Sequence, residues 1–178
     1  MVEAAGQASI IDRMIRAARL EPQVYEEVEH DQSATRQAML VVVLGAIAAG
    51  IGALYGGIIA LIVGIVAALI GWAVYAFIAY WVGTNIFKGP KTEATWGELL
   101  RTLGFASSPR VLLVLWIIPV VGFFVGLVVF IWTLVTTVIA IRQALDFDTG
   151  RAIATAVVSW LGLFVISFVV TAIVASAL

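Results

Sequence analysis

All charged side chains of this 178-residue chain, ten Lys or Arg and eleven Asp or Glu, lie in three short segments. The segments cover residues 1–36, 88–110 and 142–151, and uncharged, mostly apolar stretches cover residues 37–87, 111–141 and 152–178. As helices, these stretches would be roughly 76, 46 and 40 Å long, against a hydrocarbon core of about 30 Å. The pattern therefore predicts an all-α integral membrane protein with several transmembrane helices.

The composition indicates the same class of protein. Hydrophobic residues make up 63% of the chain, above the roughly 45–50% apolar content of ordinary soluble domains. The chain has no cysteine, which excludes a disulfide framework, thiolate chemistry and a Cys-based metal site. Because no polar stretch is long enough for a large soluble domain, we expect an N-terminal segment, residues 1–36, followed by one membrane domain, residues 37–178.

Turn signals divide the apolar stretches into spans. Tyr55-Gly56-Gly57 breaks the first stretch, and Pro119-Val120-Val121-Gly122 breaks the second. The prediction is a bundle of five spans, at about residues 37–54, 58–82, 102–118, 121–141 and 152–175. The alternative is four spans, in which residues 102–141 form one kinked and tilted helix.

The charged segments also predict the topology. With five spans they lie on one side of the membrane, because two crossings separate each segment from the next. All ten Lys and Arg residues then face one compartment, and the positive-inside bias makes that compartment the cytoplasm. We therefore expect a plasma-membrane protein with a cytoplasmic N-terminus and an outside C-terminus. Four spans would instead bring the C-terminus inside, with Arg142 and Arg151 outside.

Two amphipathic patterns mark the N-terminal segment. An apolar face occurs on each side of Pro22, made of Ile10, Ile11, Met14, Ile15 and Ala18 and then of Val24, Tyr25 and Val28. Two short amphipathic helices on the cytoplasmic membrane surface would have this pattern. The alternative is that the helices dock on the protein's own cytoplasmic loops.

Two further patterns lie within the first two spans. Small residues recur at four-residue spacing, as Gly45, Ala49 and Ala53 and as Ala60, Gly64 and Ala68, with Gly71 close by. Such stripes let helices approach closely, so we expect these two spans to form a tight hairpin. An aromatic belt is also predicted toward the cytoplasmic end of the second span, from Trp72, Tyr75, Tyr80 and Trp81.

The central charged segment leads into the third span. Thr95 and Glu98 have the spacing of a capping box, which predicts a short interfacial helix before the span. The Ser107-Ser108-Pro109 sequence interrupts that helix, because proline lacks the N–H of a regular helical turn.

The candidate polar site follows from this interruption and consists of Ser107, Ser108, Pro109 and Arg110. Arg110 lies at a depth where charge is costly, and an intramembrane charge is by default a functional-site hypothesis. The arginine could bond carbonyls freed at the break, pair with Asp146 or Asp148, or reach back to the cytoplasmic headgroups. The site would then serve a lipid or other ligand, or only the structure.

Recognisable catalytic chemistry is missing from the sequence. The single histidine, His30, excludes an ordinary intramembrane Ser-His pair. The acidic run beside it lacks metal-ligand spacing and is interpreted as a solvated helix face, formed by Glu26, Glu27, Glu29 and Asp31. No phosphate-binding loop or basic nucleic-acid patch occurs. We therefore expect no enzyme activity, no cofactor, no metal and no nucleic-acid partner.

The run GPKTEATWGELLRTLGFASSPRVLLVLWIIPVVG, residues 89–122, resembles the hallmark stretch of the Yip-domain family, which are Rab-GTPase-interacting membrane proteins. Gly104-Phe105-Ala106 and Pro109 occupy the places of the family's Gly-aromatic-Ala step and span-opening proline. IRQALDFDTGRAI, residues 141–153, is similar to the family's loop between spans four and five, and RMIRAARLEPQVYEEV is similar to the N-terminal pattern of prokaryotic members.

The resemblance implies five spans, a cytoplasmic N-terminus and, in eukaryotic relatives, a role in vesicle trafficking. The chain shows neither the long polar N-terminal extension nor the Asp-Leu-Tyr-Gly-Pro-like motif of those relatives. We therefore expect a prokaryotic-type member of the plasma membrane rather than a Rab-binding protein.

Two functions from different classes stay open at this point. The first is a non-enzymatic scaffold that organises membrane and binds protein partners, such as further copies of itself or other membrane proteins. The second is a small transporter or lipid-binding protein with its polar site around Arg110, for which anionic lipid is the candidate partner. Either protein would work within the lipid bilayer.

Overall fold

The computed structural model describes residues 9–53, 57–90, 92–118 and 120–176. The secondary structure of these residues is helical, with seven α-helices and one 3₁₀-helix, η1. In chain order they are α1 (Ile10–Ala18), α2 (Pro22–His30), α3 (Ala34–Ala53), α4 (Gly57–Asn85), α5 (Trp96–Ala106), η1 (Ser108–Ile117), α6 (Val121–Ala144) and α7 (Thr149–Ser176).

The all-α membrane architecture predicted from the sequence is confirmed. Within the described residues, five helical segments are long and apolar enough to cross a membrane: Ala34–Gly52, Gly57–Asn85, Trp96–Ile117, Val121–Ala144 and Thr149–Ser176. The third of them joins α5 to η1 and begins at Trp96, earlier than the predicted residue 102. The predicted interfacial helix is thus the first part of this segment.

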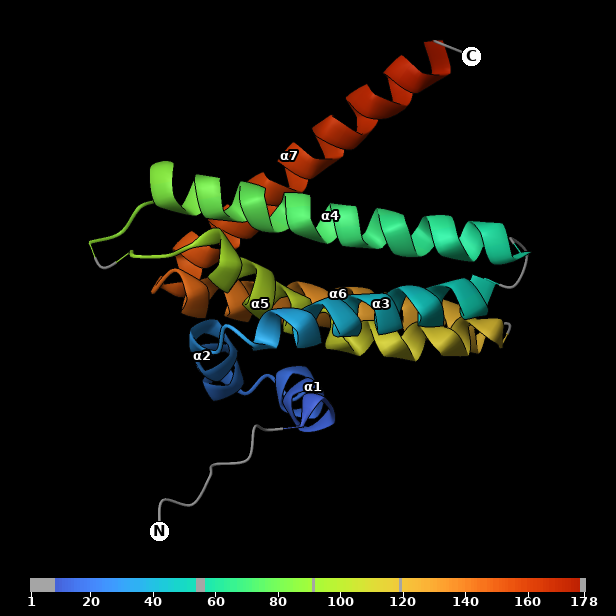
Figure 1. The fold of residues 1–178 in the computed structure, drawn as a ribbon, viewed down its shortest axis with the longest axis horizontal. Helices are drawn as coiled ribbons and strands as arrows, with labels where there is room; N and C mark the ends of the chain where they lie inside the picture. Colours follow the sequence, from blue (N-terminus) through green and yellow to red (C-terminus); the bar gives the residue numbers. More distant parts are fainter. Residues whose placement is uncertain (1–8, 54–56, 91, 119, 177–178) are drawn as a thin grey trace.

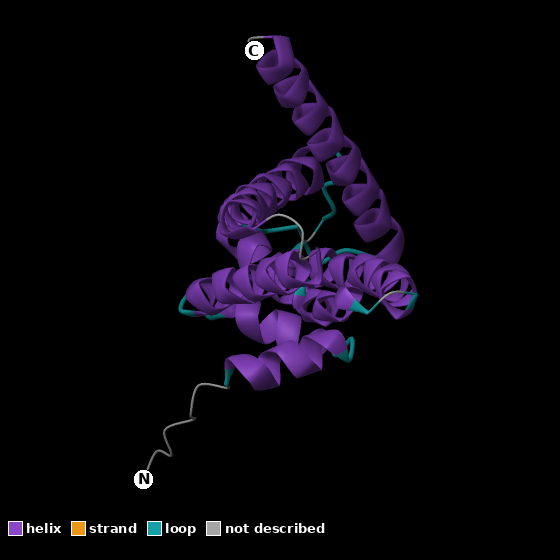
Figure 2. Cartoon of the chain, turned by 90° about the vertical axis from the view of Figure 1, so that its right-hand side faces the viewer, coloured by secondary structure: helices purple, strands orange, loops and turns teal. Residues whose placement is uncertain are grey.

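The helices are arranged in layers (Figure 1). The segment α5–η1 packs against both α3 and α6, while α4 lies on the opposite side of this layer from α1 and α2. The last helix, α7, runs obliquely away from the others toward the C-terminus, as the turned view also shows (Figure 2). The bundle is therefore tightly packed around α5 and open around α4 and α7.

The chain reverses direction between η1 and α6, which pack side by side. Residues 102–141 are therefore not the single kinked helix of the four-span alternative. The proline expected to make this turn, Pro119, lies outside the described residues. The same is true of Tyr55 and Gly56 in the turn predicted between the first two spans.

Described parts of the three charged segments lie at one end of the bundle: α2, the loop after α4, and the connection between α6 and α7 (Figure 1). The side chain of Gln143, at the end of α6, donates a hydrogen bond of 2.6 Å to Glu26 of α2. The guanidinium of Arg151, at the start of α7, lies beside Gly89 in the loop after α4. One polar face thus gathers segments that are far apart in the sequence.

The predicted hairpin between the first two spans is only partly formed. α3 and α4 contact each other, and a methyl group added at Gly50 of α3 would clash with Leu61 of α4. However, α3 packs most extensively against η1, with Gly45 facing the Cβ atom of Arg110, and a methyl group at Gly64 or Gly71 of α4 would meet no atom within 4 Å. Small residues permit close packing but do not choose the partner, and here η1 is the main neighbour of α3.

The predicted aromatic belt is only partly formed. Trp81 is 51% exposed, as a belt residue should be. Trp72 instead donates from Nε1 to the carbonyl oxygen of Leu100 at 3.1 Å, and the Tyr75 hydroxyl donates to that of Ala156 at 3.3 Å. These two aromatic side chains tie α4 to α5 and to α7, because a buried indole or phenol needs a hydrogen-bond partner.

Gly104 of α5 provides a direct test of the packing. A methyl group there would lie 3.0 Å from the Ala38 Cα atom, and backbone cannot move aside as a flexible side chain can. We expect Gly104→Ala to destabilise the protein by about 1–3 kcal/mol, which lowers the thermal transition in detergent by about 2–4 °C per kcal/mol. Gly64→Ala is the matched control and should be neutral or stabilising by up to about 1 kcal/mol. Equal transitions for the two variants would contradict this packing.

Candidate functional site

The predicted polar site begins where α5 ends. The helix starts at the predicted capping box, in which the Thr95 hydroxyl accepts from the Glu98 N–H and the Glu98 carboxylate accepts from the Thr95 N–H. Its α-helical hydrogen bonding stops at Ala106, and from Ser108 the chain tightens into the ten-residue 3₁₀-helix η1. Proline fits the first turn of such a helix, because the N–H it lacks would be unpaired there.

Hydroxyl groups satisfy the backbone carbonyls at this transition. The side chains of Ser107 and Ser108 each donate a 2.6 Å hydrogen bond, to the carbonyl oxygens of Gly104 and Phe105 respectively. The next carbonyl, of Ala106, accepts a 2.6 Å bond from the Thr136 hydroxyl on α6. Both serines are buried. Sequence analysis missed Thr136, whose role depends on which helix faces the break.

The remaining member of the predicted site, Arg110, is left without a partner. Its guanidinium makes no hydrogen bond or ion pair with any described residue. The carbonyls it was expected to bond are taken by Ser107, Ser108 and Thr136. Of the acidic partners considered, Asp148 pairs with Arg151 at 3.5 Å instead. The guanidinium of Arg110 is therefore a charged group that no described residue neutralises or hydrogen-bonds.

Arg110 lines a partly open chamber of about 1020 Å³ between α3, α4, η1, α6 and α7. The walls are mostly apolar, and large side chains such as Phe130 and Trp160 are more than half exposed there. Thr133 also lines the chamber, and its buried hydroxyl has no hydrogen-bond partner among the described residues. The wall of the chamber thus combines one charged donor and one unpaired hydroxyl with a long apolar surface.

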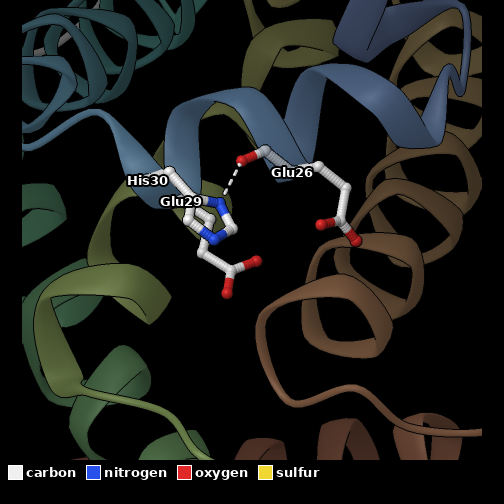
Figure 3. Close-up of side chains that lie close together, drawn as sticks. All are labelled: Glu26, Glu29 and His30. Atoms are coloured by element: carbon white, nitrogen blue, oxygen red, sulfur yellow. Dashed lines mark hydrogen bonds between the residues drawn. The ribbon is translucent and has the colours of Figure 1, made fainter.

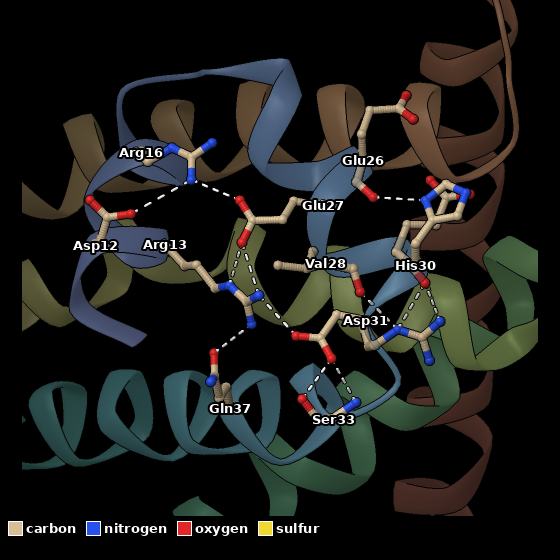
Figure 4. Close-up of polar contacts among 12 residues, drawn as sticks. Asp12, Arg13, Arg16, Glu26, Glu27, Val28, His30, Asp31, Ser33 and Gln37 are labelled. Atoms are coloured by element: carbon tan, nitrogen blue, oxygen red, sulfur yellow. Dashed lines mark hydrogen bonds and ion pairs between the residues drawn. The ribbon is translucent and has the colours of Figure 1, made fainter. Parts of the chain in front are cut away.

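A second group of polar residues, which we call the cap, joins α1 and α2 to the bundle (Figure 4). Its centre is Arg13, which is 3% exposed. It donates at 2.9 Å to Glu27, at 2.8 Å to Asp31 and at 2.9 Å to Gln37 of α3. Arg16 adds a 2.8 Å bond to the other oxygen of Glu27.

The two carboxylates of the cap are held in their charged forms. Burial alone would raise the pKa of Glu27, but the hydrogen bonds from Arg16 and Arg13 outweigh it and lower that pKa below its usual range. The pKa of Asp31 is lowered chiefly by the hydrogen bond from the Ser33 side chain, and further by Arg13. The cap is therefore a network of ion pairs at neutral pH.

Two further hydrogen bonds fasten the cap to the bundle. Arg101 of α5 is buried and donates to the last carbonyls of α2, those of Val28 and Glu29, where a cation also complements the helix dipole. Trp132 of α6 donates at 2.7 Å to the carbonyl oxygen of Ala18. Sequence analysis missed both Arg101 and Arg13. Both arginines lie among the apolar residues of amphipathic helices. This unusual position for a charged residue was the signal that could have identified them.

The alternative, in which the N-terminal helices dock on the protein, is confirmed in part for α2, which packs against α5 and α6 rather than against loops. Its three apolar residues, Val24, Tyr25 and Val28, are fully buried, and burial raises the pKa of the Tyr25 hydroxyl. α1 presents two faces. Ala17 is buried against the bundle, whereas Ile11 and Ile15 are 65% and 47% exposed.

The acidic run of α2 brings Glu26, Glu29 and His30 together, with potential ligand atoms within 4.8 Å of one another (Figure 3). Each group is partly committed elsewhere. The His30 Nδ1 atom lies 2.9 Å from the carbonyl oxygen of Glu26, and the Glu26 carboxylate accepts from Gln143. One oxygen of Glu29 is buried and has no hydrogen-bond partner in the described part of the chain. The run is thus not the fully solvated face predicted from the sequence, since Glu29 turns inward.

The pKa of Glu29 is raised to about 7, first by burial and next by the neighbouring charge of Glu26. The carboxylates of Glu98 and Asp146 raise it further, while His30 opposes them. Glu29 therefore exchanges a proton near neutral pH, and a metal ion bound by this cluster would have to displace that proton.

A family model described as the Yip1 domain matches residues 20–171. The matched region includes α2 and the first four of the described helical segments that are long enough to cross a membrane, and it ends within the fifth, α7. No curated protein and no solved structure matches the chain.

Glu29 gives the protein a predictable dependence on pH. Because folding raises its pKa from 4.5 to about 7, the folded state binds this proton more tightly. The stability it contributes is complete below pH 4.5 and is lost as the pH rises through 7. We expect Glu29→Gln to flatten the decline of the thermal transition between pH 5 and 8. Glu93→Gln, at an exposed position, is the control. If the thermal transition of Glu29→Gln declines with pH as the native one does, other titratable groups cause the pH dependence.

Proposed function

The chain belongs to the Yip1 domain family, and from that premise we propose that it is a non-enzymatic integral membrane scaffold. In this role it organises the surrounding bilayer or gathers protein partners through its cap. We further propose that it is a prokaryotic-type member of the plasma membrane. The family match supports a membrane protein without a catalytic site, and the five long apolar helices support contact with lipid along most of the chain.

The observation that carries the proposal is the outward face of α1. Ile11 and Ile15 are exposed on a helix that is otherwise clamped to the bundle through Arg13 and Trp132. Exposed aliphatic side chains on a fixed amphipathic helix are suited to the boundary between headgroups and acyl chains. A rigidly held wedge of this kind acts on the bilayer, whereas a freely hinged helix would only follow it.

We propose a cytoplasmic N-terminus and an outside C-terminus. The gathering of the three charged segments at one end of the bundle supports a shared compartment for them, and the positive-inside bias favours the cytoplasm. The orientation would direct the cap toward cytoplasmic partners.

The native chain has no cysteine, so single-cysteine labelling can test this orientation without background. We expect Lys88→Cys to react with an impermeant maleimide only after the membrane is opened. Leu178→Cys should react in intact cells. Protection of Leu178→Cys in intact cells would overturn the proposed topology.

The scaffold role is tested by reconstitution into vesicles of defined lipid, with vesicle diameter measured by electron cryomicroscopy. We expect native protein to reduce the mean diameter as the protein-to-lipid ratio rises, because a wedge in one leaflet favours curvature. The double variant Ile11→Ser with Ile15→Ser should lose most of this effect. Ile86→Ser, at an apolar position that is 53% exposed outside the cap, should retain it. Chemical cross-linking in the same vesicles tests whether copies of the protein associate. If the native protein leaves the vesicle diameter unchanged and no cross-linked oligomer forms, the scaffold proposal fails.

A further inference from the structure

The unpaired guanidinium of Arg110 indicates that the chamber binds a ligand with hydrogen-bond acceptors. Arg110 carries five N–H donors, and none has an acceptor among the described residues. Water cannot supply acceptors freely within hydrocarbon, and an unpaired guanidinium there is costly. Thr133 lines the same chamber, and its buried hydroxyl has no partner among the described residues. An acidic group in the chamber would supply acceptors for the guanidinium and a candidate acceptor for this hydroxyl.

Arg110 has no structural task that would explain its presence. The carbonyls around the break between α5 and η1 are bonded by Ser107, Ser108 and Thr136. Arg13 and Arg101, by contrast, hold cap and bundle together and have all their principal acceptors within the chain. The contrast indicates that the acceptor for Arg110 comes from outside the protein.

The dimensions of the chamber fit a hydrocarbon chain. Gly126 and Val138 of α6 both line it, and the helical rise over the twelve steps from the first residue to the second is about 18 Å. One leaflet of a bilayer contributes about 15 Å of hydrocarbon, half of a core of about 30 Å. The volume of about 1020 Å³ lies at the upper end of ordinary ligand pockets, which suits a lipid better than a small polar solute.

We propose that the chamber binds one anionic lipid, with its acidic headgroup on Arg110 and Thr133 and its acyl chain along α4, α6 and α7. Charge complementarity determines the headgroup, because a neutral or zwitterionic lipid leaves the arginine uncompensated. The apolar walls determine the tail, because a free anion would leave them empty. This site goes beyond the scaffold role and does not depend on the wedge formed by Ile11 and Ile15.

Two glycines of α4 provide a matched pair for testing the site. A methyl group at Gly71 or Gly64 would meet no atom within 4 Å, so a side chain can leave the backbone without a clash at both positions. Gly71 lines the chamber, whereas Gly64 does not. Gly71→Leu therefore fills the proposed tail site, and Gly64→Leu makes the same change outside it.

The experiment measures lipid retention by native mass spectrometry and the thermal transition in detergent, with phosphatidylglycerol, phosphatidylcholine or inorganic phosphate added. We expect the native protein to retain phosphatidylglycerol and to be stabilised by it over phosphatidylcholine. Arg110→Leu should still fold, but its preference for phosphatidylglycerol over phosphatidylcholine should fall on the order of tenfold. Gly71→Leu should lose retention, and Gly64→Leu should behave as the native protein does. Arg19→Leu, at an exposed position directly after α1, controls for loss of one positive charge.

Three results would overturn the proposal. Equal stabilisation by both phospholipids would show that the headgroup charge is not recognised. Equal stabilisation by inorganic phosphate would show that the apolar walls take no part. Equal retention by Gly71→Leu and Gly64→Leu would show that lipid binds elsewhere, and this comparison decides the case even if Arg110→Leu does not fold. None of these measurements depends on vesicle curvature, so the site and the scaffold role can fail separately.

Discussion

Within hydrocarbon, a backbone carbonyl that leaves its helix must find another donor, because water is not there to supply one. The break between α5 and η1 meets this requirement with Ser107, Ser108 and the α6 hydroxyl of Thr136. The last of these bonds fixes α6 against the break, while α3 packs along η1. Because hydroxyl groups bond these carbonyls, Arg110 is not needed for that purpose. The candidate site therefore results from the way in which the backbone break is hydrogen-bonded.

The cap uses charge in the opposite way. Arg13 and Arg101 are both buried, and each donates hydrogen bonds to acceptors within the chain. Removing one partner of such a network is more costly than the network's net contribution, since the other groups stay buried. The cap therefore specifies where α1 and α2 dock more than it stabilises them, and it fixes the direction in which Ile11 and Ile15 point.

Charge placement and hydrophobic length were sufficient to predict the helical membrane fold, and the capping box at Thr95 was readable from two residues. The partners of helices were not, because small residues on α3 permit close packing with any neighbour. The sequence also singled out Ser107, Ser108 and Arg110, but it could not assign their roles. Which group bonds a freed carbonyl depends on Thr136, and its approach is set by the tertiary arrangement of α6.

The incomplete hairpin and the unpaired arginine have a common origin. Because η1 rather than α4 is the main neighbour of α3, the glycine face of α4 is left open, and the space beside it becomes the chamber that Arg110 lines. Trp72 and Tyr75 hold α4 at this position through single hydrogen bonds to α5 and α7. An α4 packed directly on α3 would close the chamber and bury the guanidinium without an acceptor. Holding α4 away is thus what makes an intramembrane arginine compatible with a stable bundle.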